Sequence, residues 1–249
     1  MGGMDLDATD AGSGFPVILL HGFPLDRSIW GPRGPFRFIL PDLRGHGATP
    51  AADSATMDDQ ARDVLELMDC LKIDRAAIAG HSMGGYVLFA LNRLAPERIA
   101  AGLFVSTRAA ADTGEGRRAR ETGALRALAE GPGFLAESMI DRLFAPGARP
   151  EVTTRIRAVI SRSERKGVAA ALRGMASRPD STPDLPRFDK PALVIAGRGD
   201  RIVPVAESEA MAAAIPKSRL EIFDRSGHMP MMEEPERFWD VVGDFLSHV

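Results

Sequence analysis

Short apolar runs bounded by turn-forming residues recur along the whole chain. Polar and apolar positions do not alternate within these runs, which is typical of strands buried on both faces of a mostly parallel sheet. The runs that we interpret as strands are Phe15–Leu20, Phe36–Leu40, Ala76–Ala79, Ala101–Val105, Ala192–Ala196 and Arg219–Phe223.

Segments with helical periodicity lie between these runs. They are Met57–Leu71, Val87–Leu94, Val205–Ala214 and Pro235–Phe245. Strand and helix therefore alternate, which predicts an α/β fold, a doubly wound sheet with right-handed crossovers. The first of these helices contains Cys70, the only cysteine of the chain, which we expect to be a small buried residue.

One region interrupts the alternation. Between residues 108 and 180 the pattern predicts no strand but four helices: Glu115–Glu130, Phe134–Phe144, Glu151–Ser163 and Arg165–Ala176. The proline-rich stretch "RPDSTPDLPRFDKP" then predicts an extended return to the sheet. We therefore expect a core of residues 1–107 and 181–249, with residues 108–180 inserted as a helical cap. The cap is more basic than the core, which indicates either solvated helix faces or mild attraction of anionic substrates.

Composition and charge argue against nucleic-acid-binding, secreted and membrane-spanning proteins. A net charge of −3 over 249 residues gives no reason to expect nucleic acid or an anionic membrane as a partner. The N-terminal stretch "MGGMDLDATDAGSG" is acidic and lacks an apolar segment, so we expect no signal peptide. The longest apolar runs, such as Val17–Leu20, are too short to span a bilayer. A cytoplasmic monomer or homodimer is the expectation.

The stretch Gly80-His81-Ser82-Met83-Gly84 lies between an apolar run and a helical segment. A tight strand–turn–helix connection exposes its central side chain at the end of the sheet and needs small neighbours two residues to either side. The G-x-S-x-G pattern in this context predicts that Ser82 is a nucleophile at a sharp elbow. The helix that follows points backbone N–H groups toward whatever the serine attacks.

A serine hydroxyl needs a base to take its proton, and the base needs an orienting acid. Of the five histidines, His228 stands in a loop after the strand Arg219–Phe223, at the carboxyl end of the sheet where open α/β folds build their sites. Asp200 lies just past the carboxyl end of the strand in "ALVIAGRGDRIVP" and is the favoured acid; Asp224 is its rival. The chain order serine, aspartate, histidine is that of elbow-type hydrolases.

Two backbone N–H groups are needed to stabilise a developing oxyanion. Met83 follows the nucleophile and is one candidate donor; Phe23, in the loop "HGFP" after an apolar strand, is the other. The candidate substrate pocket combines core and cap residues, most of them apolar: Trp30, Arg108, Phe134, Met139, Leu143 and Phe144. An apolar pocket favours a small to medium uncharged acyl group. Arg108 at the pocket mouth would instead favour a substrate that bears a carboxylate.

The chain resembles the α/β-hydrolase superfamily along nearly its whole length. The matching stretches are "HGFPLDRSIW", "LPDLRGHGATP", "GHSMGGYVLFAL", "GRGDRIVP" and "GHMPMMEEPERF". The resemblance implies Ser82 as nucleophile, Asp200 as acid, His228 as base, and Phe23 and Met83 as oxyanion donors. "HGFPLDRSIW" together with "STRAAADTGEGRRAR" is most similar to the carboxylesterase and 3-oxoadipate enol-lactonase branch. This implies a serine esterase that acts through an acyl-enzyme on a small-molecule ester or lactone.

Two departures from the family pattern concern the sheet and one pocket wall. The segment "WGPRGPF" is too short for the helix that relatives usually place there, and the N-terminus leaves room for little more than one strand. We therefore expect fewer than eight strands. The turn "DLRGHG" is expected to have a structural role near the site.

Other functions are compatible with the same residues to different degrees. A lactonase of the enol-lactone type and a cofactor-free perhydrolase or haloperoxidase would use the same three residues, so both stay open. Haloalkane dehalogenases and epoxide hydrolases place an aspartate at the elbow, and Ser82 argues against them. A non-catalytic binding protein on this fold is a remote alternative. The loop after Val17–Leu20 lacks G-x-G-x-x-G, and His21 and His46 lack companion ligands at zinc spacing, so we expect neither a nucleotide cofactor nor a metal.

Overall fold

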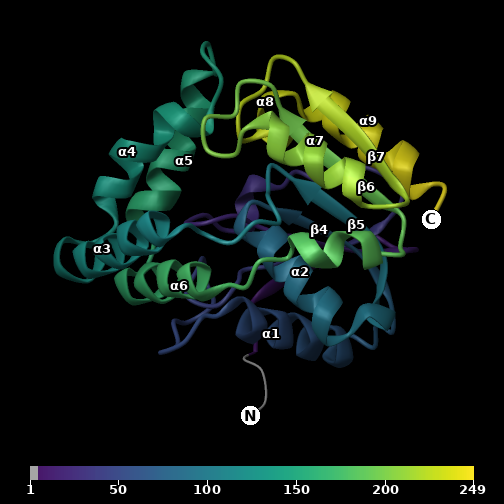
Figure 1. Ribbon diagram of the computed structural model, residues 1–249, viewed down its shortest axis with the longest axis horizontal. Helices are drawn as coiled ribbons and strands as arrows, with labels where there is room; N and C mark the ends of the chain where they lie inside the picture. Colours follow the sequence, from purple (N-terminus) through teal and green to yellow (C-terminus); the bar gives the residue numbers. More distant parts are fainter. Residues whose placement is uncertain (1–4) are drawn as a thin grey trace.

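The computed structural model describes residues 5–249, so the first four residues of the acidic N-terminal stretch lie outside it. Seven strands form one sheet in the order β1-β3-β2-β4-β5-β6-β7 (Figure 1). Their bounds are β1 Ala8–Ala11, β2 Pro16–Leu20, β3 Arg37–Pro41, β4 Ala76–His81, β5 Ile99–Val105, β6 Ala192–Gly197 and β7 Ser218–Phe223. β1 pairs antiparallel with β3, and every other neighbouring pair is parallel. The six strands predicted from apolar runs are present, and residues 5–249 contain fewer than eight strands, as expected.

Helices occupy the predicted intervals, with small differences in their bounds. They are α1 Met57–Cys70, α2 Met83–Leu94, α3 Gly114–Glu130, α4 Gly133–Leu143, α5 Pro150–Arg162, α6 Arg165–Ser177, α7 Val205–Ala214, α8 Pro230–Glu233 and α9 Pro235–Leu246. Three short 3₁₀ helices are η1 Arg27–Ile29, η2 Pro96–Arg98 and η3 Thr182–Arg187.

Three local predictions need correction. Helix α2 begins at Met83 rather than at Val87, directly after Ser82. The return after the cap contains η3 instead of being fully extended, because the φ angle that proline imposes suits a 3₁₀ turn as well as an extended chain. Cys70 is exposed, since it is the last residue of α1 and lies off the face that buries Val64 and Met68.

Helix α1 illustrates how local sequence starts an element. The Thr56 side chain accepts a hydrogen bond from the Asp59 N–H, and the Asp59 carboxylate accepts one from the Thr56 N–H, each at 3.1 Å. This capping box satisfies two N–H groups that the first helical turn leaves without partners. The helix then buries a face that contains Val64 and Met68.

The core forms where helices cover the buried strands. All residues of β4 and β5 are buried. Phe104 on β5 stacks on Phe89 of α2, with ring centroids 4.9 Å apart, and meets Phe188 edge-on at 5.4 Å. Burying one such aromatic side chain stabilises the fold by roughly 1.5–3 kcal/mol. Part of α9 covers the sheet in the same way, with Phe238 against Phe223.

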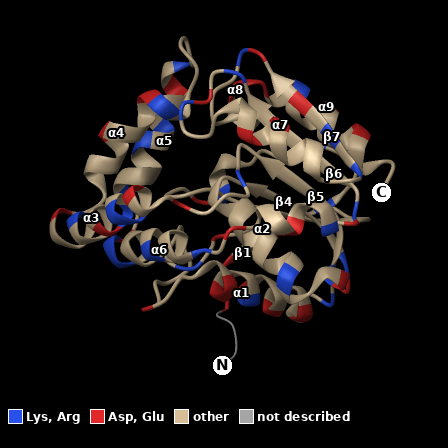
Figure 2. Ribbon diagram, in the orientation of Figure 1, with Lys and Arg blue, Asp and Glu red and all other residues tan. Residues whose placement is uncertain are grey.

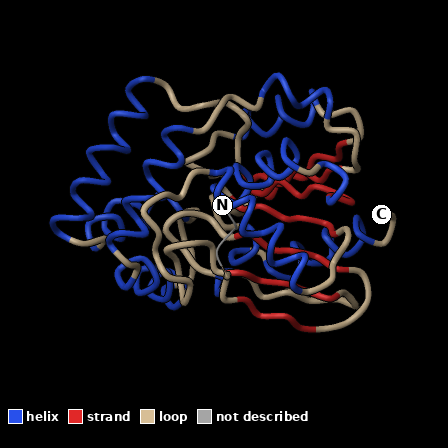
Figure 3. The backbone as a smooth tube through the Cα atoms, turned by 90° about the horizontal axis from the view of Figure 1, so that it is seen from below, coloured by secondary structure: helices blue, strands red, loops and turns tan. Residues whose placement is uncertain are grey.

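Helices α3 to α6 lie between β5 and β6 in the chain and form a separate layer beyond one end of the sheet (Figures 1 and 3). Within it α3 packs against α6, and α4 against α5. Lys, Arg, Asp and Glu are all spread over these helices (Figure 2), which favours solvated helix faces as the reason for their charge. We propose that this cap spans residues 108–180.

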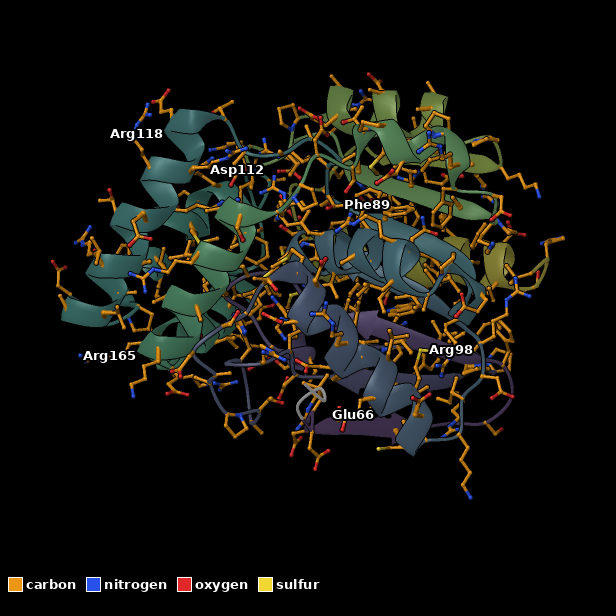
Figure 4. The ribbon with its side chains drawn as sticks, turned by 60° about the horizontal axis from the view of Figure 1, so that its bottom comes forward. Glu66, Phe89, Arg98, Asp112, Arg118 and Arg165 are labelled. Carbon is orange, nitrogen blue, oxygen red and sulfur yellow. The ribbon has the colours of Figure 1, made fainter. Side chains whose placement is uncertain are left out.

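One buried carboxylate holds the two ends of the cap together beside the core. Asp112, at the junction of the two layers (Figure 4), pairs with Arg108 at 2.7 Å, with Arg178 at 3.0 Å and with Arg120. The Arg178 guanidinium also lies 4.0 Å above the ring of Tyr86 on α2. Burial by itself raises the pKa of Asp112, but the guanidinium groups of Arg120 and Arg178 outweigh it and lower the pKa to about 2. Both connections of the cap therefore meet at one ionised group.

Within residues 5–249, the structure has no helix that combines the length and the apolar character needed to cross a bilayer.

Candidate active site

Ser82 lies at the sharp turn between β4 and α2. Its φ of 51° and ψ of −109° place it in a region that residues with a Cβ atom rarely adopt. The glycines two residues away on each side make this turn feasible. A Cβ atom on Gly80 would lie 2.3 Å from the Gly84 carbonyl oxygen, and one on Gly84 would lie 2.3 Å from the Leu20 carbonyl oxygen. Only residues without a side chain fit at these two positions.

The serine side chain does not cap the helix that it starts. Ser82 is the N-cap of α2, a position where a hydroxyl usually accepts a hydrogen bond from the first turn, yet no such bond forms. Its backbone carbonyl is fixed instead, by the Thr107 hydroxyl at 2.8 Å and by the Gly85 N–H at 3.0 Å. The Ser82 backbone is therefore held in place while its hydroxyl is not engaged by the first turn of α2.

His228 and Asp200 form a buried hydrogen-bonded pair. His228 Nδ1 lies 2.7 Å from Asp200 Oδ2, and the two side chains are 2% and 1% exposed. The other carboxylate oxygen of Asp200 accepts hydrogen bonds from the N–H groups of Ile202 (2.7 Å) and Val203 (2.9 Å). With an ionised Asp200, Nδ1 of His228 carries the proton and Nε2 is free to accept one.

Asp224, the rival acid, is in a different environment. It is exposed and pairs with Arg198, with 2.6 Å between the guanidinium Nε and the carboxylate. The hydrogen-bonded partner of His228 is therefore Asp200.

His81 is a neighbour of His228 that the sequence analysis did not assign to the site. Its Nε2 donates a hydrogen bond to the His228 carbonyl at 2.9 Å, and the two rings lie 4.8 Å apart. Burial holds the pKa of His81 well below its usual value, so the ring is neutral. Because His81 directly precedes Ser82, this bond brings the loop of His228 to the elbow. The only signal in the sequence was a histidine at the variable position of the elbow pattern.

The strand order brings the loop after β2 to the same place. β2 lies between β3 and β4, so the direction of winding reverses there, which is where open α/β sheets bind ligands. A Cβ atom on Gly22 would lie 2.5 Å from His81 Nδ1 and 3.1 Å from the Ser82 Cβ. No described residue accepts a hydrogen bond from the Phe23 N–H in this loop. Gly22 thus brings the loop that carries Phe23 against the elbow, and Met83 directly follows Ser82 as the first residue of α2.

Two further buried histidines support this loop. His21 Nδ1 lies 2.9 Å from the Gly22 carbonyl and therefore donates, while its Nε2 accepts from the Leu43 N–H at 2.9 Å. His46 packs against the His21 ring at 5.2 Å and places its Nδ1 3.0 Å from the Arg44 carbonyl. Burial lowers the pKa of His21 to about 4 and that of His46 to about 3. Both rings are neutral, and the turn that carries His46 has a structural role.

The predicted pocket residues fall into separate environments. Leu143 and Phe144 lie against the loop of His228, since the Leu143 carbonyl accepts from the His228 N–H at 2.8 Å. Trp30 packs against Phe238 and Trp239 of α9 and edge-on to His81, inside the core.

The remaining candidates lie on or beside the cap. Phe134 stacks under the Arg126 guanidinium, 4.3 Å from its ring centroid, and Met139 is half-buried. Arg108 is held by Asp112. Residues 5–249 contain no group of three His, Cys, Asp or Glu side chains arranged to hold a metal ion.

Comparison with known proteins gives consistent matches along the chain. The family model described as the alpha/beta hydrolase family matches residues 17–241. A thermophilic esterase from Thermogutta terrifontis, solved with malate bound, is 42% identical; the match covers 98% of this chain and 93% of that one, with a TM-score of 0.96. The enol-lactonase from Burkholderia xenovorans LB400 is 30% identical, with coverages of 97% and 96% and a TM-score of 0.90. 3-oxoadipate enol-lactonase 1 of Acinetobacter baylyi is 25% identical, over 94% of this chain and 89% of that protein.

The neutral state of His21 and His46 predicts how stability depends on pH. Their folded pKa values of about 4 and about 3 lie below the unfolded value near 6.5. As the pH is lowered, these histidines therefore bind protons in the unfolded chain before they do so in the folded chain. The free energy of unfolding consequently falls as the pH decreases below about 6.5. The expected slope is about 1.4 kcal/mol per pH unit for each ring.

Urea unfolding at pH 7, 6 and 5 measures this slope. His46→Gln should reduce it by about 1.4 kcal/mol per pH unit, whereas His248→Gln, at an exposed site, should leave it unchanged. An unaltered slope in His46→Gln would contradict the assignment.

Proposed function

The chain belongs to the alpha/beta hydrolase family, and on this basis we propose that it is a serine hydrolase that cleaves carboxylic esters through an acyl-enzyme on Ser82. The observation that carries the proposal is the 2.7 Å hydrogen bond between His228 Nδ1 and Asp200, in a loop that His81, the residue before Ser82, also binds; the Ser82 hydroxyl caps no helix. A base in the correct tautomer and an unengaged hydroxyl are what acyl transfer requires.

In the acylation step, Ser82 Oγ attacks the carbonyl carbon of the ester while His228 Nε2 takes the hydroxyl proton. The carbonyl oxygen becomes an oxyanion, which the N–H groups of Phe23 and Met83 stabilise. When the carbon–oxygen bond of the ester breaks, the imidazolium returns its proton to the leaving alkoxide. Asp200 stays ionised and stabilises the imidazolium while it exists.

In the deacylation step, water takes the place of the alcohol. His228 removes a proton from the water, which attacks the acyl carbon, and the proton then passes to Ser82 Oγ as the acid leaves. Neutral His81 supports the loop of His228 without adding a competing charge, because burial keeps its pKa low.

The relatives support this class of reaction and suggest two candidate classes of substrate, esters and lactones. The relative from Thermogutta terrifontis is an esterase, and two others are enol-lactonases. We favour uncharged esters with a small to medium acyl group, because Leu143 and Phe144 lie beside the His228 loop and Arg108 already pairs with Asp112. A lactone that bears a carboxylate is the second candidate. It is favoured by the named enol-lactonases and by the excess of guanidinium groups around Asp112.

Ser82→Ala should abolish hydrolysis of p-nitrophenyl butyrate and leave the fold intact, because the covalent route needs the serine oxygen. The expected loss of kcat is at least about 10³-fold. Initial rates, circular dichroism and labelling by a fluorophosphonate test this. Retention of more than about a tenth of the wild-type kcat would remove Ser82 from the nucleophile role.

Asp200→Asn should lower kcat by roughly 10³–10⁴-fold, because the amide no longer stabilises the imidazolium or selects its tautomer. Asp224→Asn is the matched control, since this carboxylate is exposed and pairs with Arg198. Steady-state kinetics of the two variants decide which carboxylate orients His228. A larger loss in Asp224→Asn would mean that the wrong carboxylate has been assigned.

A substrate panel tests the acyl preference. We expect a higher kcat/KM for the butyrate than for the octanoate p-nitrophenyl ester, and no advantage for lactones that bear a free carboxylate. The panel contains esters and lactones with and without that carboxylate, measured at one pH and salt concentration. Turnover of carboxylate-bearing lactones alone would favour the lactonase.

A further inference from the structure

Helix α8 directly follows the loop of His228, and its last residue turns its carboxylate back onto that loop. Glu233 Oε2 accepts hydrogen bonds from the N–H groups of Gly227 (2.8 Å) and Met229 (3.3 Å), the two residues that flank His228. Its other oxygen, Oε1, accepts from the N–H of Ala145 at 2.7 Å. One carboxylate thus joins both neighbours of the histidine to the connection between α4 and α5.

The same two segments also meet through their backbones. The His228 N–H donates to the Leu143 carbonyl at 2.8 Å. A Cβ atom on Gly227 would lie 2.7 Å from the Ala145 nitrogen and 2.7 Å from the Phe144 carbonyl carbon, so only glycine permits this approach. A displacement of the cap connection would therefore move the loop that carries the histidine.

An open space lies beside the contact between these segments. A cavity of about 510 Å³ adjoins Glu233 and is lined on the cap side by Ala145 to Arg149. Burial raises the pKa of Glu233, and the three backbone N–H groups act in the opposite direction by binding the ionised form. Hydrogen bonds to a charged acceptor are stronger than those between neutral groups, and here they span the edge of an open space.

We propose that Glu233 is a positioning residue for His228, which ties the histidine loop to the connection between α4 and α5 of the cap and so holds the imidazole in place. This inference rests on the proposed role of His228 as the base. Glu233 acts through the backbone of Gly227 and Met229, which it contacts. A displacement of about 1 Å at a catalytic group can cost about 100-fold in rate, so a small shift of this loop is measurable.

Glu233→Gln tests the proposal, because the amide keeps the shape but faces three N–H donors with only one good acceptor. Glu234→Gln is the matched control. Glu234 is the adjacent residue and accepts from the Ser226 hydroxyl (2.8 Å) and the Arg225 N–H (3.3 Å), an earlier part of the same loop. We expect Glu233→Gln to lower kcat for p-nitrophenyl butyrate by about 10- to 100-fold with KM unchanged, and Glu234→Gln to lower kcat much less.

Amide hydrogen exchange gives a readout that does not need activity. Exchange at Ala145, Gly227 and Met229 should accelerate in Glu233→Gln and not in Glu234→Gln. An unchanged kcat in Glu233→Gln, or equal losses in both variants, would overturn the proposal. If Glu233→Gln does not fold, Glu233→Asp replaces it: reduced kcat at constant KM supports the positioning role, and wild-type kcat and exchange overturn it.

If the proposed function is wrong, the experiments give a different result from a failure of the Glu233 proposal alone. In that case the wild-type protein would hydrolyse no ester, and a fluorophosphonate would not label Ser82. The exchange experiment still decides whether Glu233 ties the loop to the cap. Unaltered protection at Ala145, Gly227 and Met229 in Glu233→Gln would then overturn that connection independently.

Discussion

The turn at Ser82 holds a residue with a side chain at a φ of 51°, and the rest of the site depends on how the surrounding backbone accommodates it. Such a conformation costs of order 1–3 kcal/mol and persists only where neighbouring structure enforces it. Gly80 and Gly84 let strand, turn and helix approach within distances that no Cβ atom permits. Gly22 brings the loop after β2 against the same turn. The loop that carries Phe23 reaches the turn at Ser82 only because Gly22 carries no side chain.

His228 is held by segments from four parts of the chain. Asp200 binds its Nδ1, His81 binds its carbonyl, Leu143 accepts from its N–H, and Glu233 binds its two neighbours. Each contact engages a different atom, so together they restrict both the position of the loop and the orientation of the ring. Because one of these segments is the end of α4, the cap takes part in holding the histidine.

Ion pairs at the base of the cap hold its two ends together. Asp112 receives guanidinium groups from both connections and from α3, and removing it would leave the buried guanidinium of Arg178 without a charged partner. On the other side of the cap, Arg162 of α5 pairs with the buried Asp26 at 2.7 Å, and the Ser163 hydroxyl bonds the Pro24 carbonyl at 3.1 Å. The cap is therefore tied down near the loop after β2 and near the His228 loop, the two loops that meet at Ser82.

The sequence by itself determined the alternation of strands and helices, the inserted helices between β5 and β6, and the elbow at Ser82. These follow from local causes: apolar runs, helical periodicity and glycines two residues from a serine. It also placed Asp200 and His228 at the carboxyl edge, but it left Asp224 open. Only the tertiary structure decided which carboxylate meets the histidine, that Arg108 pairs with Asp112, and that Cys70 is exposed. It alone revealed the contacts of His81 and Glu233 with the His228 loop, because these join segments far apart in the chain whose meeting depends on strand order and on the docking of the cap.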